Sequence, residues 1–297
     1  MNKRKLGHSD LYVSELGLGC MNIGQDRSTA RQTIETALEL GVNYLDTADL
    51  YDQGLNEEII GEVIKNKRKD IILATKAGNR FEKGKEGWSW DPSKSHIKQA
   101  VKDSLQRLQT DYIDLYQLHG GTIDDPIDET IEAFEELKQE GLIRYYGLSS
   151  IRPNVIREYI ERSSIVSVMM QYSLLDRRPE ELFPLFEQKQ ISVVVRGALA
   201  KGLLTDKPLA PTSSYLTYSA EELAAVRHSL DNHTRSNNSI ALHYCLSSEV
   251  VASVLAGASK AGQVRDNVQA ILTEHLSEAE RRQLQDITKQ DLYQDHR

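Results

Sequence analysis

Short apolar runs alternate with longer amphipathic segments along almost the whole chain of 297 residues. The short runs are rich in β-branched residues and predict strands, whereas the longer segments between them predict helices. This order is typical of βαβ units, whose strands form a parallel sheet. Eight strands are expected, at residues 14–20, 42–46, 71–76, 113–119, 143–149, 165–171, 191–196 and 251–257.

Several of the expected helices carry signals at their ends. Ser93 is a suitable N-cap for a helix over the amphipathic residues 97–108. Gly141 follows the next amphipathic segment and is typical of the position just after a helix. Near the C-terminus, Ser277 and Glu280 have the spacing of a capping box, which predicts one more helix there.

The number of units favours a closed barrel. Eight units give about 37 residues per unit, close to the repeat of a (β/α)8 barrel. An open doubly wound sheet is the alternative, but it would usually divide at a linker, and no long Pro-, Gly- or Ser-rich stretch marks one. We therefore predict an α/β protein with a (β/α)8 TIM barrel as a single domain over residues 1–297. Residues 78–92 and 205–219 exceed ordinary loop length and are expected at the C-terminal face, where barrel active sites lie.

The composition excludes several other classes of protein. Lys and Arg number 36 against 44 Asp and Glu, and the net charge of −8 disfavours nucleic acid or an anionic membrane as the main partner. Cys20 and Cys245 have neither disulfide-framework nor zinc-site spacing, and the eight histidines show no ligand-like cluster. No apolar stretch reaches the roughly 18 residues of a membrane helix, and no signal peptide is evident. A monomeric, cytoplasmic protein without a metal is expected.

Titratable residues stand at the ends of three successive expected strands. Asp46, Lys76 and His119 end the second, third and fourth strands, and Tyr51 follows the second strand. Strand ends of a parallel barrel meet at one rim, so these four side chains are expected to converge. A neighbouring ammonium stabilises a phenolate and lowers the pKa of a tyrosine, so Lys76, oriented by Asp46, would make a tyrosine an effective proton donor. Taken singly, each residue is more often a cap or a packing residue, but the set favours an active site.

Two other segments suggest contacts with a ligand. Gly17, Gly19 and Gly24 have the spacing G-x-G-x4-G, which differs from a dinucleotide fingerprint and instead indicates a tight strand exit where backbone approaches a ligand closely. Ser259 and Lys260 follow the last strand at the start of a helix, which is a favourable place for an anion. An ordinary helix cap with a solvated lysine explains this second segment equally well.

The segments around these residues resemble the aldo-keto reductase family. GVNYLDTADLY contains Asp46 and Tyr51, ILATKAG contains Lys76, and DYIDLYQLHG contains His119. The similarity continues through IRYYGLSS, MMQYSLLDRR, VVVRGALAKGLLTDK and LAGASKAGQVRDN, in the family's order and spacing. The resemblance implies a (β/α)8 barrel that binds NADPH (or NADP+) without a Rossmann motif.

The resemblance also implies a set of cofactor-binding residues from several strand ends. They are Gly19, Cys20, Met21, Asp46, Ser149, Gln171, Tyr172, Arg196, Gly197, Leu199, Lys201, Gly202, Gly257, Ser259, Lys260, Gln263, Asp266 and Asn267. The expected roles run from the nicotinamide at the fifth to seventh strands, through the pyrophosphate at the loop after the seventh, to the 2′-phosphate after the eighth.

This chain departs from the family at several of these positions. Ser150 stands where the family usually has Asn, and the strand-six glutamine aligns with Met169, although Gln171 faces the same side of the strand. Arg196 stands where many members stack a tyrosine on the nicotinamide, and a planar guanidinium can also stack on a ring. Gln263 stands where arginine is common, which weakens the case for NADP over NAD.

The activity that the resemblance implies is NADPH-dependent reduction of an aldehyde or ketone to an alcohol. Tyr51 would be the general acid, and Lys76 would lower the pKa of its hydroxyl. Asp46 would hold Lys76 in position, and His119 would orient the oxygen of a small carbonyl substrate. Some similar barrels instead serve as cofactor-sensing regulatory subunits with little turnover. The presence of all four catalytic residues favours the enzyme.

Overall fold

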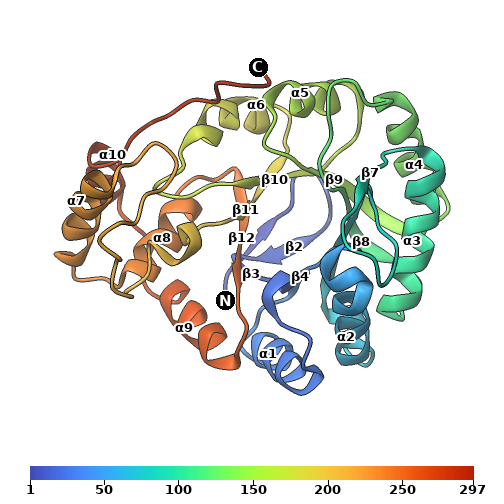
Figure 1. The fold of residues 1–297 in the computed structure, drawn as a ribbon, viewed down its shortest axis with the longest axis horizontal. Coiled ribbons are helices and arrows are strands. Elements are labelled where there is room, and N and C mark those ends of the chain that lie inside the picture. The colour runs from blue at the N-terminus through green and yellow to red at the C-terminus, as the bar shows by residue number, and fades with distance from the viewer.

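Eight parallel strands close into a barrel in the computed structural model, which describes residues 1–297. The strands follow one another around the barrel in chain order, and the last pairs with the first (Figure 1). All eight match the predicted ranges to within two residues at either end, and the (β/α)8 class is confirmed. They are β3 (Leu16–Gly19), β4 (Tyr44–Asp46), β5 (Ile72–Ala77), β8 (Ile113–Leu118), β9 (Ile143–Ser149), β10 (Ser167–Gln171), β11 (Ser192–Arg196) and β12 (Val251–Gly257).

Helices surround the barrel and cover the outer face of its strands (Figure 1). They are α1 (Arg27–Glu39), α2 (Leu55–Ile64), α3 (Lys94–Leu108), α4 (Ile127–Gln139), α5 (Pro153–Arg162), α6 (Phe183–Gln188), α7 (Ala220–Asp231), α8 (Asn237–Leu246), α9 (Ala261–Ile271) and α10 (Glu278–Asp286). Ser93 caps α3 through its side chain, and Gly141 follows α4 with φ +76°. Ser277 and Glu280 form the predicted capping box of α10. None of the helices is both long and apolar enough to cross a membrane.

A hairpin that the sequence analysis did not predict closes the N-terminal end of the barrel. Its strands are β1 (Lys3–Lys5) and β2 (Tyr12–Ser14), which pair antiparallel. Leu6, Leu11 and Val13 pack in one cluster with residues that point into the barrel, among them Tyr44 and Leu115. Because residue 14 belongs to this hairpin, the first barrel strand begins two residues later than predicted.

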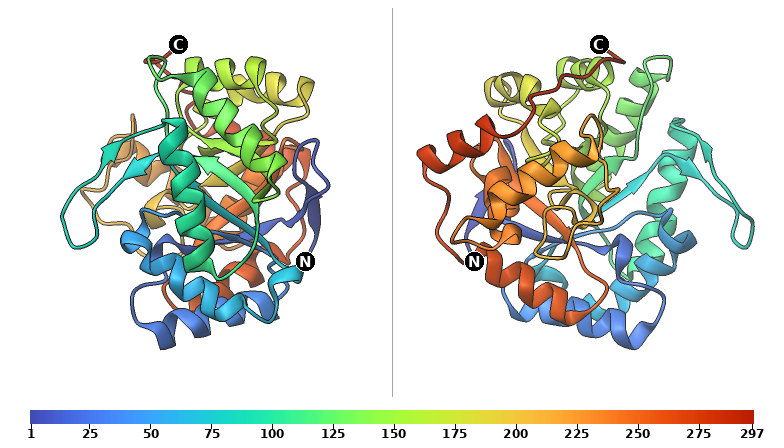
Figure 2. Two further views of the ribbon diagram at one scale, coloured as in Figure 1. Left: turned by 90° about the vertical axis from the view of Figure 1, so that its right-hand side faces the viewer. Right: turned by 60° about the vertical axis from the view of Figure 1, so that its left-hand side comes forward.

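The other end of the barrel is polar and carries the long loops. Residues 78–92 contain a second small hairpin, β6 (Asn79–Arg80) with β7 (Ser89–Trp90), whose loop projects away from the barrel (Figure 2, left). The segment 203–219 follows β11 and leads to α7. Arg227 of α7 donates to the carbonyl oxygen of Leu203 over 2.6 Å and thereby anchors the start of this segment.

Candidate active site

The register of the strands brings the predicted polar residues to one level of the barrel. Asp46 ends β4 opposite Ala74 of β5, and Lys76, two residues further along β5, lies opposite Gln117 of β8. Asp46, Lys76 and Gln117 are at most 3% exposed. Most of their polar atoms therefore need hydrogen-bond partners within the protein.

The ammonium of Lys76 lies at the centre of this group. Its Nζ donates to Asp46 Oδ1 and to the carbonyl oxygen of Thr47, both over 2.6 Å, and lies 3.4 Å from the Tyr51 hydroxyl. Burial opposes the charge on Lys76, but Asp46 and Tyr51 together favour it through their charges and hydrogen bonds, so the pKa of Lys76 is raised. The lysine therefore stays a cation at neutral pH, next to the Tyr51 hydroxyl.

His119 completes the group as a neutral ring. It follows β8 and meets Tyr51 edge to face, with ring centroids 5.9 Å apart. Burial and the charges of Lys76 and Arg196 lower the pKa of His119 to about 3. Nδ1 of His119 has no partner within the protein. A neutral imidazole has one N–H donor and one acceptor nitrogen, so it can donate a hydrogen bond to a bound molecule without carrying charge.

Gln117 is a member of this network that the sequence analysis missed. Its Nε2 donates to Asp46 Oδ2 over 3.1 Å, which satisfies the carboxylate oxygen that Lys76 leaves free. The signal was available, since Gln117 lies two residues before His119 and side chains two apart on a strand share a face. The candidates were chosen for titratable side chains, and the amide of Gln117 does not titrate.

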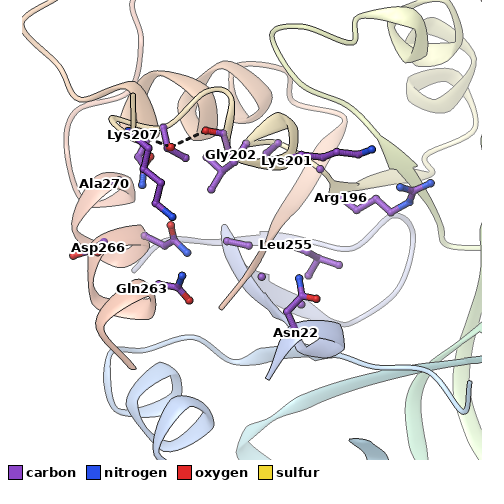
Figure 3. Close-up of a pocket in the computed structure, with 18 of the residues that line it drawn as sticks. Asn22, Arg196, Lys201, Gly202, Lys207, Leu255, Gln263, Asp266 and Ala270 are labelled. Atoms are coloured by element: carbon purple, nitrogen blue, oxygen red, sulfur yellow. Dashed lines mark hydrogen bonds between the residues drawn. The ribbon is translucent and has the colours of Figure 1, made fainter. Parts of the chain in front are cut away.

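A cavity of about 1290 Å³ extends from this group to α9 at the C-terminal face. Both Asp46 and Tyr51 line it. Most of the expected cofactor-binding residues line it as well: Gly19, Met21, Asp46, Gln171, Arg196, Gly197, Leu199, Lys201, Gly202, Gly257, Gln263, Asp266 and Asn267. Figure 3 shows Arg196 and Lys201 on one side of the cavity, and Lys207 on the other side near Gln263 and Asp266 of α9.

Five expected cofactor-binding residues do not line this cavity. Cys20 is fully buried, and the Tyr172 hydroxyl is directed to Glu180, 3.0 Å away in the core. Both side chains are held by packing, so neither faces the cavity.

The other three lie near its edges. Ser149 is half-buried and pairs with Met169, which does line the cavity. Ser259 donates through its backbone N–H and its hydroxyl to Gln263 Oε1, and Lys260 is exposed as the N-cap residue of α9.

Gln171 is held by several partners beside the cavity. Its Nε2 donates to Asp176 over 2.9 Å and lies 3.2 Å from the Tyr215 hydroxyl, while its Oε1 accepts from Arg196 over 3.2 Å. Met169 lines the cavity as well, so the structure brings both candidate positions of β10 to it.

Other lining residues were absent from the expected set, notably Asn22, Lys207 and Tyr215. Lys207 lay within the segment VVVRGALAKGLLTDK that carried the resemblance, but no residue pattern distinguished it from a solvated lysine.

The cavity suits a dinucleotide in size and in the chemistry of its walls. It exceeds the 300–1,000 Å³ that is usual for small-molecule sites. Gly19 and Gly257 lie opposite each other on neighbouring strands, and a Cβ added to Gly257 would come within 3.2 Å of Asn22 Nδ2. Backbone is therefore exposed to the cavity where a larger residue would narrow it. Arg196, Lys201 and Lys207 supply positive charge for phosphates.

The barrel and its polar rim define an oxidoreductase of the aldo/keto reductase family, to which this chain belongs. The sequence model of the protein family described as "Aldo/keto reductase family" matches residues 15–289 of the chain. This confirms the family that the sequence motifs indicated.

Individual relatives cover nearly the whole chain. Aldo-keto reductase AKR11C1 from Bacillus halodurans, solved in its holo form, has a TM-score of 0.98 and 64% identity, covering 100% of this chain and 99% of that chain. The uncharacterized oxidoreductase YqkF of Bacillus subtilis is 61% identical over 305 residues, covering 100% of both chains. The NADH-specific methylglyoxal reductase of Escherichia coli is 32% identical over 314 residues, covering 94% of this chain and 96% of that protein.

Proposed function

We propose that this protein is an NADP(H)-dependent reductase that converts small aldehydes or ketones into alcohols, with Tyr51 as the general acid. The observation that carries the proposal is the position of the buried Lys76 ammonium, which contacts both Asp46 and the Tyr51 hydroxyl. An ion pair that served only to stabilise the fold would need Lys76 to contact Asp46, but not the Tyr51 hydroxyl as well. A hydroxyl that is half-buried at the cavity and next to a cation is suited to giving up a proton.

Each of the four residues has a distinct part in the proposed reaction. The nicotinamide, when bound, supplies the hydride. Tyr51 donates its hydroxyl proton to the carbonyl oxygen, and Lys76 stabilises the phenolate that remains. Asp46 and the Thr47 carbonyl oxygen fix the position of Lys76. His119, as a neutral ring, donates a hydrogen bond to the same substrate oxygen as negative charge develops there.

The residues that line the large cavity would hold the cofactor. Gln171 and Arg196, with Ser149 at the edge, would surround the nicotinamide, and Gly197, Leu199, Lys201 and Gly202 the pyrophosphate. At the other end, Ser259 and Lys260 would hold the 2′-phosphate, and Gln263, Asp266 and Asn267 the adenosine. Gly19, Met21 and Gly257 would form the floor, with Cys20 and Tyr172 supporting it from the core.

A cofactor-sensing role with little turnover is the competing function, and the complete set of Asp46, Tyr51, Lys76 and His119 favours the enzyme. Steady-state consumption of NADPH with a panel of aldehydes, run beside fluorescence titration of NADPH binding, separates the two. We expect tight binding together with turnover of at least one aldehyde at an ordinary enzyme rate, on the order of 1 s⁻¹ or more. Tight binding with negligible turnover of the whole panel would contradict the proposal and support the sensor.

A further inference from the structure

The turn that carries Tyr51 has a strained backbone and leads directly into α2. Asp52, Gln53 and Gly54 have positive φ, at +48°, +52° and +90°, and α2 follows at once. Non-glycine residues adopt positive φ only at a cost in energy, so the surrounding structure must hold this turn in place. The Tyr51 hydroxyl lies 3.4 Å from Lys76 Nζ, near the limit of a hydrogen bond, so a small shift of the turn would break this contact.

Asn56, in the first turn of α2, is bonded to residues that follow two strands of the barrel. It is 0% exposed, its Oδ1 accepts from Thr47 Oγ1 over 2.7 Å, and its Nδ2 donates to the Cys20 carbonyl oxygen over 2.8 Å. Thr47 follows β4, and its own carbonyl oxygen accepts from Lys76 Nζ. Asn56 therefore ties the start of α2 to the segment that orients the lysine.

Glu57, the next residue, is bonded to β5 and to α3. It is 0% exposed as well, and its Oε1 accepts from Thr75 Oγ1 over 2.5 Å. Thr75 directly precedes Lys76 in β5, and because side chains alternate along a strand, Thr75 faces the helices while Lys76 faces the barrel interior. Glu57 Oε2 accepts from Arg107 Nε of α3 over 2.7 Å, which balances the buried charge. Glu57 thereby ties the start of α2 to the strand that carries the lysine.

Arg107 also packs against the strained turn. A Cβ added to Gly54 would lie 2.7 Å from Arg107 Cδ, so the stem of the arginine lies directly on the glycine. Ser104 and Glu57 accept hydrogen bonds of 3.1 and 2.7 Å from the guanidinium and hold it there. The turn is thus packed against α3, and the helix that follows it is bonded to β5 and to the end of β4.

Neither Asn56 nor Glu57 caps α2. Polar side chains at the start of a helix usually bond to its free N–H groups, but the N-cap of α2 makes no side-chain bond, and these two side chains bond to other elements. Buried polar side chains contribute little net stability compared with apolar residues of the same volume. Their contacts with Thr47 and Thr75, the residues next to Asp46 and Lys76, therefore indicate a role in the geometry of the site.

We infer that Asn56 and Glu57 are positioning residues of the proposed reaction. Together they hold the turn so that the Tyr51 hydroxyl stays beside the Lys76 ammonium, although neither of them lines the large cavity. The inference rests on the proposed function, because the distance between Tyr51 and Lys76 matters for catalysis only if Tyr51 donates the proton. A displacement of about 1 Å at a catalytic group can lower a rate by about 100-fold.

Replacing each threonine by the isosteric valine tests the two contacts separately. Thr75→Val removes the hydroxyl that donates to Glu57, and Thr47→Val removes the one that donates to Asn56 but leaves the Thr47 carbonyl oxygen. In each variant we expect single-turnover reduction of butanal by bound NADPH to slow by about 5- to 50-fold. The dissociation constant of NADPH should stay within about twofold of wild type, because the contacts act on Tyr51 and not on the cofactor.

Two matched variants assign the effect to these hydrogen bonds. Thr33→Val removes an equally buried hydroxyl, which donates to the Thr29 carbonyl oxygen within α1 over 2.8 Å, and should keep the wild-type rate. Thr75→Ser keeps a hydroxyl for Glu57 and should recover most of the rate that Thr75→Val loses. A Thr75→Ser variant as slow as Thr75→Val would overturn the role of the Glu57 contact.

The same change in a Tyr51→Phe background separates positioning from a general effect on the fold. Without the hydroxyl there is nothing left to position, so adding Thr75→Val should slow the residual single-turnover rate by less than about twofold. Its effect on the free energy of unfolding should be the same in both backgrounds. A loss of rate as large as in the wild-type background would overturn the inference.

The measurements also distinguish this inference from the proposed function. If the wild type reduces neither butanal nor any other aldehyde of the panel, the proposed function fails. If it reduces butanal and both valine variants are as fast as Thr33→Val, only the positioning role fails. If only one of the two is as fast, the assignment of its partner, Asn56 or Glu57, is overturned.

Discussion

The two ends of the large cavity are built differently. At one end, Asp46 and Lys76 come from the interior of the barrel, are almost fully buried and bond to each other and to the backbone. At the other end, Ser259, Lys260 and Gln263 are exposed at the start of α9. Ser259 donates to Gln263 Oε1, and the Gln263 N–H donates to the Lys260 carbonyl oxygen over 3.1 Å, so these residues bond locally and not to the interior of the barrel. The buried end thus has few other conformations open to it, whereas the exposed end is adjustable.

We therefore expect the buried end to carry out the proposed chemistry and the exposed end to contribute to cofactor affinity. Removing one partner of a buried ion pair leaves the other charge buried with neither water nor a counter-charge to stabilise it. Substitutions there should therefore affect both catalysis and stability. Exposed side chains at a helix start contribute to affinity for an anion but little to the fold. The following changes should therefore have effects that decline from the buried end to the exposed end.

The largest effect is expected from Lys76→Met. It removes the cation beside Tyr51 and leaves Asp46 buried without its partner, so kcat for an aldehyde should fall by about 10²- to 10⁴-fold and unfolding free energy by about 3–5 kcal/mol. Because Lys76 acts on the proton that Tyr51 donates, Lys76→Met combined with Tyr51→Phe should lose little more kcat than either change alone. Single-turnover rates of the four proteins measure the coupling.

The exposed Lys69→Met is the matched control for removing an amine. It should leave both kcat and the unfolding free energy near the wild-type values. Losses in kcat that add fully in the double variant would show that Lys76 and Tyr51 act separately.

A smaller effect, on stability alone, is expected from Asp49→Asn near the buried end. Asp49 is 2% exposed and its Oδ1 has no partner. Burial, and secondarily the nearby Glu57, raise the pKa of the Asp49 carboxyl to about 8. The folded state therefore holds a proton that the unfolded state releases above about pH 4, and stability is lost as pH rises from 4 to 8. Asp49→Asn should remove this loss and stabilise the protein by about 2–4 kcal/mol at pH 8.

Denaturant unfolding at pH 5 and pH 8 measures this effect, with the exposed Asp111→Asn as the control. The gain from Asp49→Asn should be larger at pH 8 than at pH 5. An equal gain at both values would mean that Asp49 does not titrate in this range.

The smallest effect is expected at the exposed end, from Lys260→Glu. A lysine contact to a 2′-phosphate should contribute roughly 1.5–3 kcal/mol, or about 10- to 150-fold in affinity. The variant should therefore lose most of the preference for NADPH over NADH while its affinity for NADH and its melting temperature stay nearly unchanged. Fluorescence titration of both cofactors measures the preference, and Lys67→Glu, which changes the net charge equally before β5, is the control.

A Lys260→Glu variant that kept the wild-type preference would place the phosphate elsewhere. Lys207, which lines the cavity from the loop after β11, and Arg265 of α9 would then be the next residues to replace.

The eight strands and the meeting of Asp46, Tyr51, Lys76 and His119 were predictable from the sequence, because strand ends of a parallel barrel share one rim. The hairpin of residues 3–14 was not, since strands of three residues are too short to show an alternating pattern, and the residues that the hairpin packs on, such as Tyr44 and Leu115, lie far along the chain. Gln117 was missed because an amide acts here only through Asp46. Tyr172 was expected to contact the cofactor because it lies in a family motif, yet its hydroxyl donates to Glu180 in the core. The packing of the core sets this orientation, which cannot be predicted from the position of the residue at the end of a strand.

The central claim is that Tyr51 is the proton donor of an aldehyde reductase, and Tyr51→Phe tests it most directly because it removes one hydroxyl and little volume. Single-turnover reduction of an aldehyde should slow by about 10²- to 10⁴-fold. The dissociation constant of NADPH, measured on the same protein, should stay within about twofold of wild type, since the hydroxyl acts on the substrate. A rate near that of the wild type, with NADPH bound normally, would contradict the role of Tyr51 as the acid.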